Sequence, residues 1–590
     1  MIVLGYSGVH GSAEFTARKF PDLSTRSQRF SQGYDSAAAI IVDGGVEFAI
    51  AEERLVGRKA TGEFPVRAIE LALDSLGLTP RDIHTVSHGF NFRRHKAYDA
   101  NSTARERYDE VYSPQTQVAL IRELLGEEWN GRFQPVEHHL AHAASAFYQS
   151  GFDRALVVVA DGMGEQESLT VATADRNGIV PISRVGAAHS LGVFYSAITH
   201  HLGFVPAMDE YKVMGLAPYG DPARYIDALR DLIIPLGSYR FSIPLLAADT
   251  SERDRVTHAS LMRHLGERIG SPRQPGEPLT ESHADLAASL QAVFEENLMR
   301  ILENGRAGTG MTQLCLAGGS ALNCTMNSRA LQSGLFDDVF VPPGAGDDGT
   351  SVGAALFTSA ASGELPHPAP RLDMPYWGPA YPHTSIRDAL LTHDLDVQEI
   401  AGKVAKATAE RLSEGELVGW FQGRAEFGPR ALGNRSILAE PSRRATRDRL
   451  NSVIKEREQF RPFAPMVTAE HVHDYFRLGR ARPEAFHHML FVAEVHPDLA
   501  DSLAAVIHVD GTARVQVVTQ SGNPLLWELL TEYAQLGHPP ILLNTSFNLR
   551  GQPIVTSPQQ AVDTFCRSQL DRLVIGPYNV RRRTVPKDSR

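Results

Sequence analysis

Two histidines four residues apart, His138 and His142, have a spacing that suits metal binding. The surrounding string EHHLAHAASAF, at 137–147, has a good helical period, and residues four apart on a helix share one face. One face can hold one metal ion. An isolated pair of histidines with this spacing more often has no metal, so a metal site requires a third ligand.

Two carboxylates at the ends of predicted strands, Asp161 and Asp347, are candidates for that ligand. Asp161 is the second residue of the string ADGMGE. Asp347 lies in PPGAGDDGTSVGAAL, which matches the G-x-G-x-x-G pattern of dinucleotide-binding loops. Two carboxylates in such a loop would repel a pyrophosphate group unless a cation lay between them. A metal ion resolves this conflict, and imidazole with carboxylate ligands suits Fe²⁺, Mn²⁺ or Zn²⁺ better than Mg²⁺.

Glycine-rich turns accompany these residues at 161–164 (DGMG) and 318–320 (GGS). Glycine has no Cβ atom, so the backbone N–H groups of such turns can approach phosphate oxygens closely. Each turn taken alone is more often an ordinary turn. Several of them at strand ends, without a Walker lysine, suit the ATP cleft of an actin-like protein.

Arginines gather further along the chain, at 423–436 (GRAEFGPRALGNRS) and 455–463 (KEREQFRPF). They alternate with glycine, proline and aromatic residues, and planar guanidinium groups among rigid residues suit capture of a phosphate or carboxyl group. The strings at 508–514 (HVDGTAR) and 543–548 (LNTSFN) could hold an amide or a phosphate oxygen, or could form a turn and a helix cap. The run at 581–583 (RRR) is expected to be a solvated tail.

The composition is that of a globular protein with more than one domain. The 590 residues exceed the roughly 250–300 that one hydrophobic core supports. A net charge of −11 disfavours a broad nucleic-acid surface, and three cysteines without C-x-x-C spacing indicate neither a disulfide framework nor a zinc ribbon. Because no leader or membrane-spanning apolar run is evident, a cytoplasmic protein is expected.

The order of predicted elements occurs twice in the first part of the chain. Each copy has three strands, the last two joined by a hairpin with Asp43-Gly44 or Asn177-Gly178 at its turn. The strands are expected at 2–6, 38–42 and 46–51, with a helix at 66–76, and again at 155–160, 168–173 and 179–183. This pattern predicts the duplicated ribonuclease-H-like α/β fold of actin and sugar kinases, which clamps ATP between its halves.

A proline-rich stretch at 362–383 separates this part from the remainder, because no helix or central strand accepts that density of proline. A second α/β domain is expected to follow it. Its elements are a helix at 403–413 and strands at 417–421, 515–518 and 541–543. The predicted division is an actin-like domain at 1–365, a linker at 366–395 and a second domain at 396–590.

Several strings of the chain resemble the carbamoyltransferases of the NodU/TobZ/CmcH type. HHLAHAASAF, ADGMGE, EYKVMGLAPYG, AGGSALNC and PGAGDDGTSVGAAL resemble that family's amino-terminal, actin-like domain of the ASKHA and Kae type. GWFQGRAEFGPRALGNRSIL, REQFRPFAP, HVDGTARVQ and LLNTSFNLRGQPIV look like its YrdC-like carboxy-terminal domain. The resemblance covers nearly the whole chain, and several of the strings are highly specific.

The resemblance implies a set of functional residues. The metal ligands would be His138, His142, Asp161 and Asp347. Carbamoyl phosphate would bind to Arg430, Lys455, Arg461, Arg514, Asn544 and Ser546. ATP would bind to Gly162, Gly164, Lys212, Gly318, Gly319, Asn323 and Asp348. The acceptor would meet His10, Tyr34 and Asp35.

The resemblance also implies a reaction and its partners. The carboxy-terminal domain would free carbamate from carbamoyl phosphate and join it to ATP as carbamoyl-adenylate, which then meets a hydroxyl of an antibiotic-type natural product. The implied cofactors are ATP with Mg²⁺ and one transition ion, Fe²⁺ foremost, with Mn²⁺ or Zn²⁺ as alternatives. A monomer or homodimer without nucleic acid or membrane partners is expected. Alternatives are a threonylcarbamoyl-type tRNA-modifying enzyme and a non-catalytic actin-like ATP-binding module.

One segment departs from the family pattern. Family members carry His-Asp near the amino terminus where this chain has Tyr34-Asp35, so a tyrosine stands at the place of the histidine that would activate the acceptor. About twenty additional residues, at 11–32, precede it. They are either an acceptor-specific loop or a disordered insertion.

Overall fold

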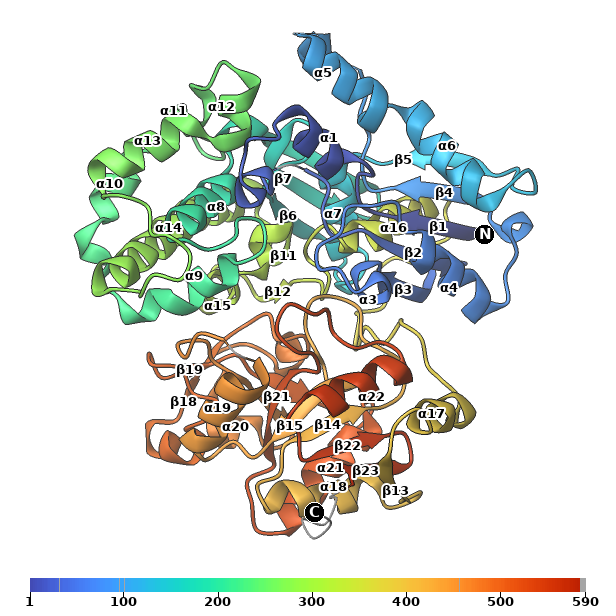
Figure 1. The fold of residues 1–590 in the computed structure, drawn as a ribbon. Helices are drawn as coiled ribbons and strands as arrows, with labels where there is room; N and C mark the ends of the chain where they lie inside the picture. Colours follow the sequence, from blue (N-terminus) through green and yellow to red (C-terminus); the bar gives the residue numbers. More distant parts are fainter. Residues whose placement is uncertain (31, 95, 100, 456, 584–590) are drawn as a thin grey trace. The chain divides into compact units, whose positions relative to one another are not determined.

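The computed structural model describes residues 1–583 except 31, 95, 100 and 456. By its internal contacts the chain divides into two compact units, each with its own sheets and helices (Figure 1). The first unit comprises residues 1–56 and 60–372, and the second comprises 57–59 and 373–590.

The described residues of the first unit contain two five-stranded sheets with the same strand order. The order is β3-β2-β1-β4-β5 in one and β8-β7-β6-β11-β12 in the other. The first three strands of each set are antiparallel, and the last two join the sheet in parallel. The first sheet consists of β1 (Ile2–Tyr6), β2 (Ala37–Val42), β3 (Gly45–Ala51), β4 (Thr85–His88) and β5 (Arg132–Pro135). The second consists of β6 (Ala155–Ala160), β7 (Glu167–Asp175), β8 (Gly178–Gly186), β11 (Gln313–Ala317) and β12 (Asp338–Phe340).

This repeated order confirms the predicted duplication. The six predicted strands are present, with ends that differ by at most three residues, and the first hairpin turns at Asp43 (φ 49°) and Gly44 (φ 83°). Positive φ at both residues is the turn that matches the twist of two paired strands. β2 and β6 are apolar and almost entirely buried, since helices cover the sheets.

Two helices with small side chains, α7 (His138–Phe147) and α16 (Gly349–Ala361), pack tightly against one another. A Cβ atom at Gly353 would lie 1.9 Å from the carbonyl oxygen of Ala141, and one at Gly5 of β1 would lie 2.0 Å from that of Ser351. Only glycine permits these approaches. The crossing brings the first turn of α7 close to the residues that precede α16.

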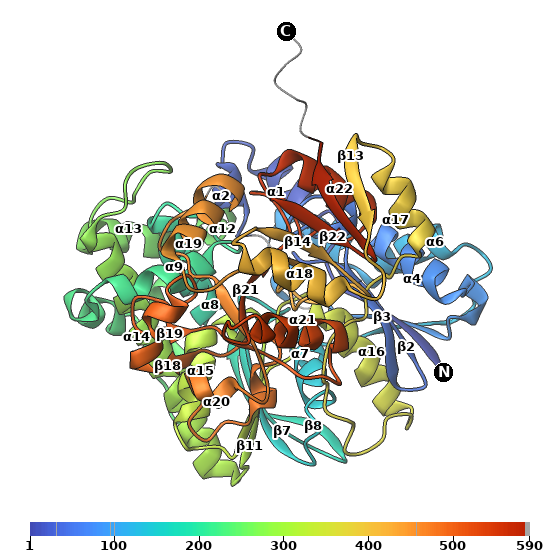
Figure 2. The ribbon, with the colours of Figure 1, turned by 90° about the horizontal axis from the view of Figure 1, so that it is seen from below.

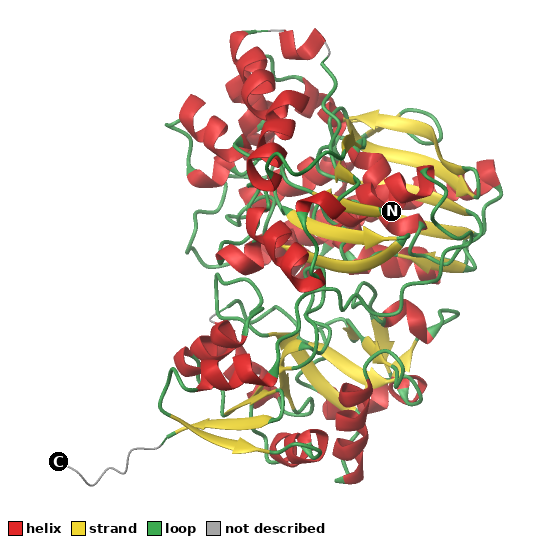
Figure 3. Cartoon of the chain, turned by 90° about the vertical axis from the view of Figure 1, so that its right-hand side faces the viewer, coloured by secondary structure: helices red, strands yellow, loops and turns green. Residues whose placement is uncertain are grey.

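Other helices of the first unit lie beside its two sheets, and the side view in Figure 3 shows helices next to strands in this unit. The long helix α14 packs against β6 of the second sheet. The helices are α1 (Ser12–Lys19), α2 (Thr25–Gln28), α3 (Glu53–Val56), α4 (Val66–Leu76), α5 (Ser102–Arg107), α6 (Pro114–Leu125), α8 (Leu191–His201), α9 (Glu210–Leu216), α10 (Ile226–Arg230), α11 (Pro244–Ala247), α12 (Glu252–Thr257), α13 (Ala259–Arg268), α14 (Glu281–Thr309) and α15 (Cys324–Gln332). A short ribbon, β9 (Ile234–Pro235) with β10 (Phe241–Ser242), completes the unit.

The second unit is also α/β, as predicted, and Figure 2 shows its helices α18 and α21 side by side. Its main sheet has the order β13-β23-β22-β14-β15-β21-β16-β20. The strands are β13 (Leu395–Glu399), β14 (Val418–Phe421), β15 (Arg435–Ala439), β16 (Ala464–Thr468), β20 (Gln516–Val518), β21 (Ile541–Ser546), β22 (Arg572–Ile575) and β23 (Tyr578–Arg582), with a smaller sheet of β17 (Phe476–Arg477), β18 (Ala493–Val495) and β19 (Thr512–Ala513). The helices are α17 (His383–Leu390), α18 (Val404–Ser413), α19 (Arg444–Arg449), α20 (Val472–Tyr475), α21 (Pro524–Gln535) and α22 (Pro558–Arg567). Its kinship with YrdC-like domains stays a prediction.

The segment predicted as a linker, 366–395, is divided between the two units. Residues up to Leu372 pack with the first unit, where Leu372 donates a hydrogen bond to the carbonyl of Gln149. Residues from Asp373 onward belong to the second unit, and α17 lies inside the predicted linker with Ile386 and Leu390 buried. The proline-rich stretch at 362–382 contains neither helix nor strand, as predicted. α17 begins directly after its last proline, Pro382.

Arg581 and Arg582 are exposed, as predicted, but they end β23 and do not form a tail. The guanidinium of Arg582 donates hydrogen bonds of 2.9 Å to the carbonyls of Phe565 and Ser568 and lies over the Phe565 ring. These carbonyls lie at and just beyond the end of α22. Carbonyls there need donors from outside the helix, and the arginine supplies them.

Within the described part of the chain, no helix is both long and apolar enough to cross a membrane.

We expect Gly353→Ala to destabilise the first unit by about 2 kcal/mol, since the new Cβ atom would force α7 and α16 apart. Gly266 of α13 is the matched control, because a Cβ atom there meets no other atom within 4 Å. Gly266→Ala should leave stability unchanged or raise it by up to about 1 kcal/mol, the gain in helix propensity. Urea unfolding of both variants checks this, and equal stability would contradict the tight crossing.

Candidate functional site

The two histidines and two aspartates singled out in the first unit meet in one cluster. His138 and His142 lie one turn apart on α7, Asp161 directly follows β6, and Asp347 precedes α16. The Nε2 atom of His138 lies 3.4 Å from an oxygen of each aspartate, and that of His142 lies 3.5 Å from Asp347. One ligand atom from each of the four residues lies within 4.8 Å of the others, an arrangement that could hold a metal ion.

Neighbouring groups hold His138 and Asp161 in position. The carbonyl of Gly89 lies 2.9 Å from Nδ1 of His138, so Nδ1 donates to it and Nε2 is the ring atom that could bind a metal. The two oxygens of Asp161 accept hydrogen bonds from the backbone N–H groups of Gly319 (3.0 Å) and Met163 (3.2 Å). The Phe90 ring stacks on His138 with 4.0 Å between centroids.

The charges of the cluster favour a cation at its centre. Burial lowers the pKa of His138, but the neighbouring charge of Asp347 and the contacts with Asp161 outweigh it and raise that pKa well above its usual value. Burial raises the pKa of Asp161 and Asp347, yet the histidines hold both below the usual range. One buried and one partly buried carboxylate thus favour positive charge beside them, and the imidazole and carboxylate donors fit a divalent transition ion.

The predicted phosphate loops border this cluster. Gly318 has φ 89°, and a Cβ atom there would lie 2.3 Å from the carbonyl of Ala160. The backbone N–H of Gly319 donates to the carboxylate of Asp161. The N–H of Gly164 closes the 161–165 loop by donating to the carbonyl of Glu167 at 2.7 Å. Gly162 lies within this same loop. The N–H groups of Gly319 and Gly164 are therefore bonded within the protein, whereas a Cβ atom at Gly162 would meet no other atom within 4 Å.

Three more residues predicted to bind ATP have partners within the protein. Asp348 caps α16 by accepting from the N–H of Gly349, and burial raises its pKa to about 7. The amide of Asn323 pairs with that of Gln291 at 2.9 and 3.0 Å and caps α15. Lys212 forms a 3.1 Å ion pair with Asp209. Asn323 in particular uses both of its polar atoms to stabilise the fold.

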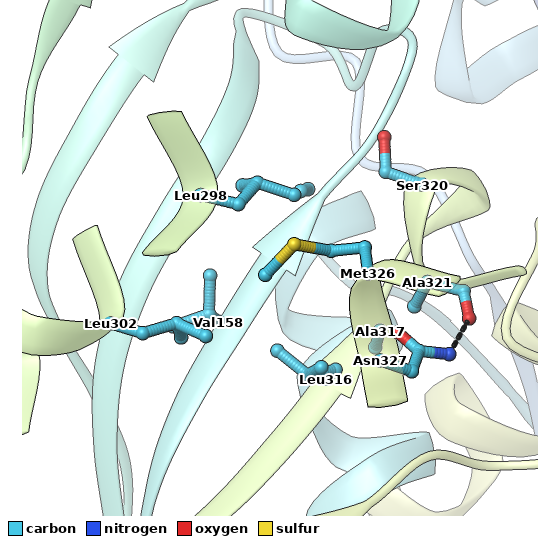
Figure 4. A pocket seen from close by; sticks show the side chains of 10 residues that line it. Val158, Leu298, Leu302, Leu316, Ala317, Ser320, Ala321, Met326 and Asn327 are labelled. Atoms are coloured by element: carbon cyan, nitrogen blue, oxygen red, sulfur yellow. Dashed lines mark hydrogen bonds between the residues drawn. The ribbon is translucent and has the colours of Figure 1, made fainter. Parts of the chain in front are cut away.

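An apolar cavity of about 20 Å³ lies beneath the 318–320 turn. Val158, Leu298, Leu302, Leu316 and Met326 point into it (Figure 4). The amide of Asn327 turns to the carbonyl of Ala321 instead, at 2.7 Å. Such a volume accommodates nothing larger than a water molecule, and an apolar lining offers that water no partners, so this cavity is a packing feature.

The residues predicted to meet the acceptor lie in the loops that follow β1 and precede β2. Nδ1 of His10 lies 2.6 Å from the carboxylate of Glu63, a contact that raises the pKa of His10. Asp35 has φ 60°, and burial, with the charge of Asp348 adding to it, raises its pKa well above the usual value. The ring of Tyr34 is covered by the guanidinium of Arg29 at 3.8 Å.

The segment at 11–32 is ordered in its described residues, so the alternative of a disordered insertion is wrong for them. It forms α1 and α2. Arg26 donates to the carbonyls of His200 and Phe204, which fastens α2 to the end of α8. Gln32 donates to the carbonyls of Met163 (2.9 Å) and Gly164 (2.8 Å), in the loop that Asp161 begins. The segment therefore borders the metal-ligand cluster.

The second unit contains a polar cavity of about 90 Å³ lined by four arginines. The lining brings together five of the six residues predicted to bind carbamoyl phosphate, namely Arg430, Arg461, Arg514, Asn544 and Ser546. The side chain of Lys455 lies outside the described residues. The fourth arginine, Arg457, was not predicted as a ligand, although it lies in REQFRPF, a string whose arginines among aromatic and proline residues indicate an anion site. Its guanidinium lies 4.1 Å from the centroid of the Phe463 ring.

Asn544 gives this cavity a polar floor. Its side chain is buried, and its amide nitrogen donates to the carbonyl of Ala431 (3.1 Å) and to Oε1 of Gln516 (2.7 Å). Within the described residues, no group donates to its Oδ1 atom. Because the amide orientation is held by two bonds, Oδ1 can accept an N–H from a bound molecule.

Two arginines of the 423–436 string lie outside this cavity and have structural roles. Arg435 is fully buried over the Phe421 ring and donates to the carbonyls of Gln422 and Gly423, among others. Arg424 donates to the carbonyls of Trp377 and Gly378. The sequence could not separate them from Arg430, because all three occur among the same small and rigid residues.

Two family models match the chain, one over each unit. The model described as "Carbamoyltransferase N-terminus" matches residues 31–356, and "Carbamoyltransferase C-terminus" matches residues 409–582. Together they include the four clustered ligands and the arginine-lined cavity. The chain carries a carbamoyltransferase domain pair.

Curated relatives agree with these matches. Nodulation protein NolNO of Sinorhizobium fredii is 38% identical over 94% of this chain and 80% of the relative. Nodulation protein NolO of Bradyrhizobium diazoefficiens is 42% identical over 76% of this chain and 79% of the relative. The 3'-hydroxymethylcephem-O-carbamoyltransferase of Streptomyces clavuligerus is 33% identical over 63% of this chain and 65% of the relative.

Likeness to solved structures is weak. Full-length HypF in its phosphate- and nucleotide-bound form has 14% identity and a TM-score of 0.31 over 61% of this chain and 55% of that one. ROK hexokinase from Thermus thermophilus has 13% identity and a TM-score of 0.28 over 60% and 98%. The fold assignment therefore rests on the strand order, and the function on the family. By both family models and by its relatives, the chain belongs to the carbamoyltransferase family and is an enzyme that transfers carbamoyl groups.

Proposed function

We propose that this enzyme takes the carbamoyl group of carbamoyl phosphate, activates it with ATP as carbamoyl-adenylate, and transfers it to a hydroxyl of a small natural product. The observation that carries the proposal is the presence of two separately built sites. One is an arginine-lined cavity in the second unit, and the other is a cluster of metal ligands with glycine loops in the first. The activity in the name of the Streptomyces clavuligerus relative supports a hydroxyl of a small molecule as acceptor.

The arginine-lined cavity suits carbamoyl phosphate. A phosphate dianion is matched by guanidinium groups, of which Arg430, Arg461 and Arg514 are three, and charge-assisted bonds of this kind are the strong ones. The carbamoyl end carries an NH₂ group, and the buried Oδ1 of Asn544 can accept from it. A phosphate without an amide would satisfy the arginines but leave this oxygen without a donor.

The reaction balances in three steps. Cleavage of the C–O bond of carbamoyl phosphate, with water, yields carbamate and orthophosphate. A carbamate oxygen attacks the α-phosphorus of ATP, so pyrophosphate leaves and a mixed anhydride with AMP forms. The acceptor oxygen then attacks the carbamoyl carbon, AMP leaves, and the hydroxyl proton passes to a base. Activation is needed because carbamate is a poor electrophile, whereas AMP is a good leaving group.

The metal ion would be held by His138, His142, Asp161 and Asp347, and Fe²⁺ is our first candidate, with Mn²⁺ and Zn²⁺ as alternatives. When bound, it supplies Lewis-acid stabilisation of phosphate oxygens that gain charge as AMP departs. ATP, accompanied by Mg²⁺, would place its phosphates at the glycine turns of the same unit.

Two residues near β1 could receive the acceptor proton. The raised pKa of the Asp35 carboxyl makes its carboxylate a stronger base than an ordinary aspartate. The imidazole of His10 is oriented by Glu63, which also stabilises its protonated form. Tyr34 and the 11–32 segment would contact the acceptor, because Gln32 fastens this segment to the loop that begins at Asp161.

Purified enzyme given carbamoyl phosphate and ATP should release pyrophosphate and AMP, because adenylation removes the β and γ phosphates together. Chromatographic separation of the nucleotides with a coupled pyrophosphate assay measures both. ADP as the sole nucleotide product would replace the adenylate with a kinase-like step.

Arg461→Ala and Arg430→Ala should each weaken carbamoyl phosphate binding by about 10- to 100-fold, since a charge-assisted contact contributes about 1.5–3 kcal/mol. ATP affinity should not change. Arg443→Ala in the same unit is the control, because that side chain is 68% exposed and lies outside the cavity. Calorimetric titration distinguishes them, and weakened ATP binding with normal carbamoyl phosphate binding would mean that the two sites are assigned backwards.

Asp347→Asn should abolish stoichiometric metal binding and transfer to the acceptor, because it removes a charge from the ligand set without changing its shape. Asp337→Asn, at an exposed position ten residues earlier, is the control. Metal content by mass spectrometry gives the answer independently of activity. A variant that retains one metal ion per chain and the full rate would reduce Asp347 to a turn residue.

A further inference from the structure

Glu165 ends the ADGMGE loop and is not among the clustered ligands, yet its carboxylate reaches the helix that bears two of them. Oε1 and Oε2 of Glu165 accept from the backbone N–H of His138 at 3.1 and 3.2 Å. Oε1 also accepts from the backbone N–H of Asn91. One side chain thus receives hydrogen bonds from two separate segments of backbone.

These two segments are the ones that aim His138. Its N–H is the first of α7, so a carboxylate there fixes where the helix begins and how its first turn is rotated. Asn91 lies two residues after Gly89, whose carbonyl binds Nδ1 of His138. Glu165 therefore acts on both the backbone and the ring of the same ligand.

Glu165 also connects the two halves of the first unit at the metal-ligand cluster. It lies in the loop after β6 of the second sheet, whereas Asn91 lies in the loop after β4 of the first. The loop that Glu165 ends is the one that Asp161 begins, only four residues earlier. A single carboxylate thereby ties the positions of Asp161, α7 and the Gly89 loop to one another.

We propose that Glu165 is a positioning residue of the metal site, which sets the separation between Asp161 and the two histidines of α7 without contacting the metal. This inference rests on the proposed metal site. Outer partners of this kind usually alter metal affinity by about 10- to 100-fold.

Glu165→Gln tests the proposal, because glutamine keeps the shape but turns an NH₂ group toward one of the two N–H donors. Titration of the metal-free full chain with Co²⁺ should show affinity lowered by about 10-fold or more. The visible absorption bands of the bound Co²⁺ should also shift, since their positions report ligand geometry. Glu165→Asp keeps the charge but shortens the reach, and it should also lose affinity.

Glu137→Gln is the matched control. Glu137 stands beside His138 at the start of the same helix, and its side chain pairs with Arg184 rather than with the N–H of His138. It removes the same charge near the same ligand, so its Co²⁺ affinity and spectrum should equal those of the wild type. Circular dichroism of the metal-free variants checks that each one folds.

Wild-type affinity and an unchanged spectrum in folded Glu165→Gln and Glu165→Asp would overturn the role of Glu165. Equal losses in Glu137→Gln and Glu165→Gln would also overturn it, because a general charge effect on the helix would then suffice. If wild-type chain binds no Co²⁺, Fe²⁺ or Mn²⁺, the proposed metal site fails instead.

Discussion

The need to compensate two neighbouring carboxylates, the buried Asp161 and the partly buried Asp347, is the constraint on which the cluster in the first unit depends. Leaving either charge without a partner in the interior would cost several kcal/mol, so the fold must deliver cationic or metal-binding groups to the same point. His138 and His142 arrive there because α7 crosses α16 at Gly353, where the backbones nearly touch. β6 packs against α7, and Asp161 directly after it lies 3.4 Å from Nε2 of His138. The glycine turns at 161–165 and 318–320 lie beside the same point.

The second unit has the opposite electrostatic requirement, because its cavity concentrates positive charge that an anion would have to compensate. Four arginines line the cavity, and Asn544 adds an acceptor that two hydrogen bonds hold in position. The string around it also supplies Arg435 and Arg424, which bind backbone carbonyls and hold the loop in shape. A fully buried Glu426 accepts from the N–H groups of Leu432 and Arg435 in the same loop. The arginines of one short string therefore divide between building the loop and facing the cavity.

Sequence reasoning predicted what depends on local pattern. Strands such as ALVVVA at 155–160, the hairpin at Asp43-Gly44, and the proximity of His138, His142, Asp161 and Asp347 followed from periodicity, turn chemistry and residue type. What it missed depends on packing between distant segments. The end of α22 attracts Arg582, residues up to Leu372 dock on the first unit, and Glu165 binds the start of α7, yet none of these pairs is close in sequence. The ordered state of the described residues of 11–32 likewise rests on contacts of Arg26 and Gln32 with residues more than a hundred positions away.

The central claim is that one transition-metal ion binds where β6, α7 and the loop before α16 meet. Anomalous diffraction from crystals grown with Fe²⁺, recorded on both sides of the iron absorption edge, tests it most directly. The account predicts a single strong peak bonded to Nε2 of His138 and His142 and to carboxylate oxygens of Asp161 and Asp347, at about the 2.0–2.2 Å typical of such ligands. A peak at any other group of side chains, or none in crystals of active enzyme, would contradict it.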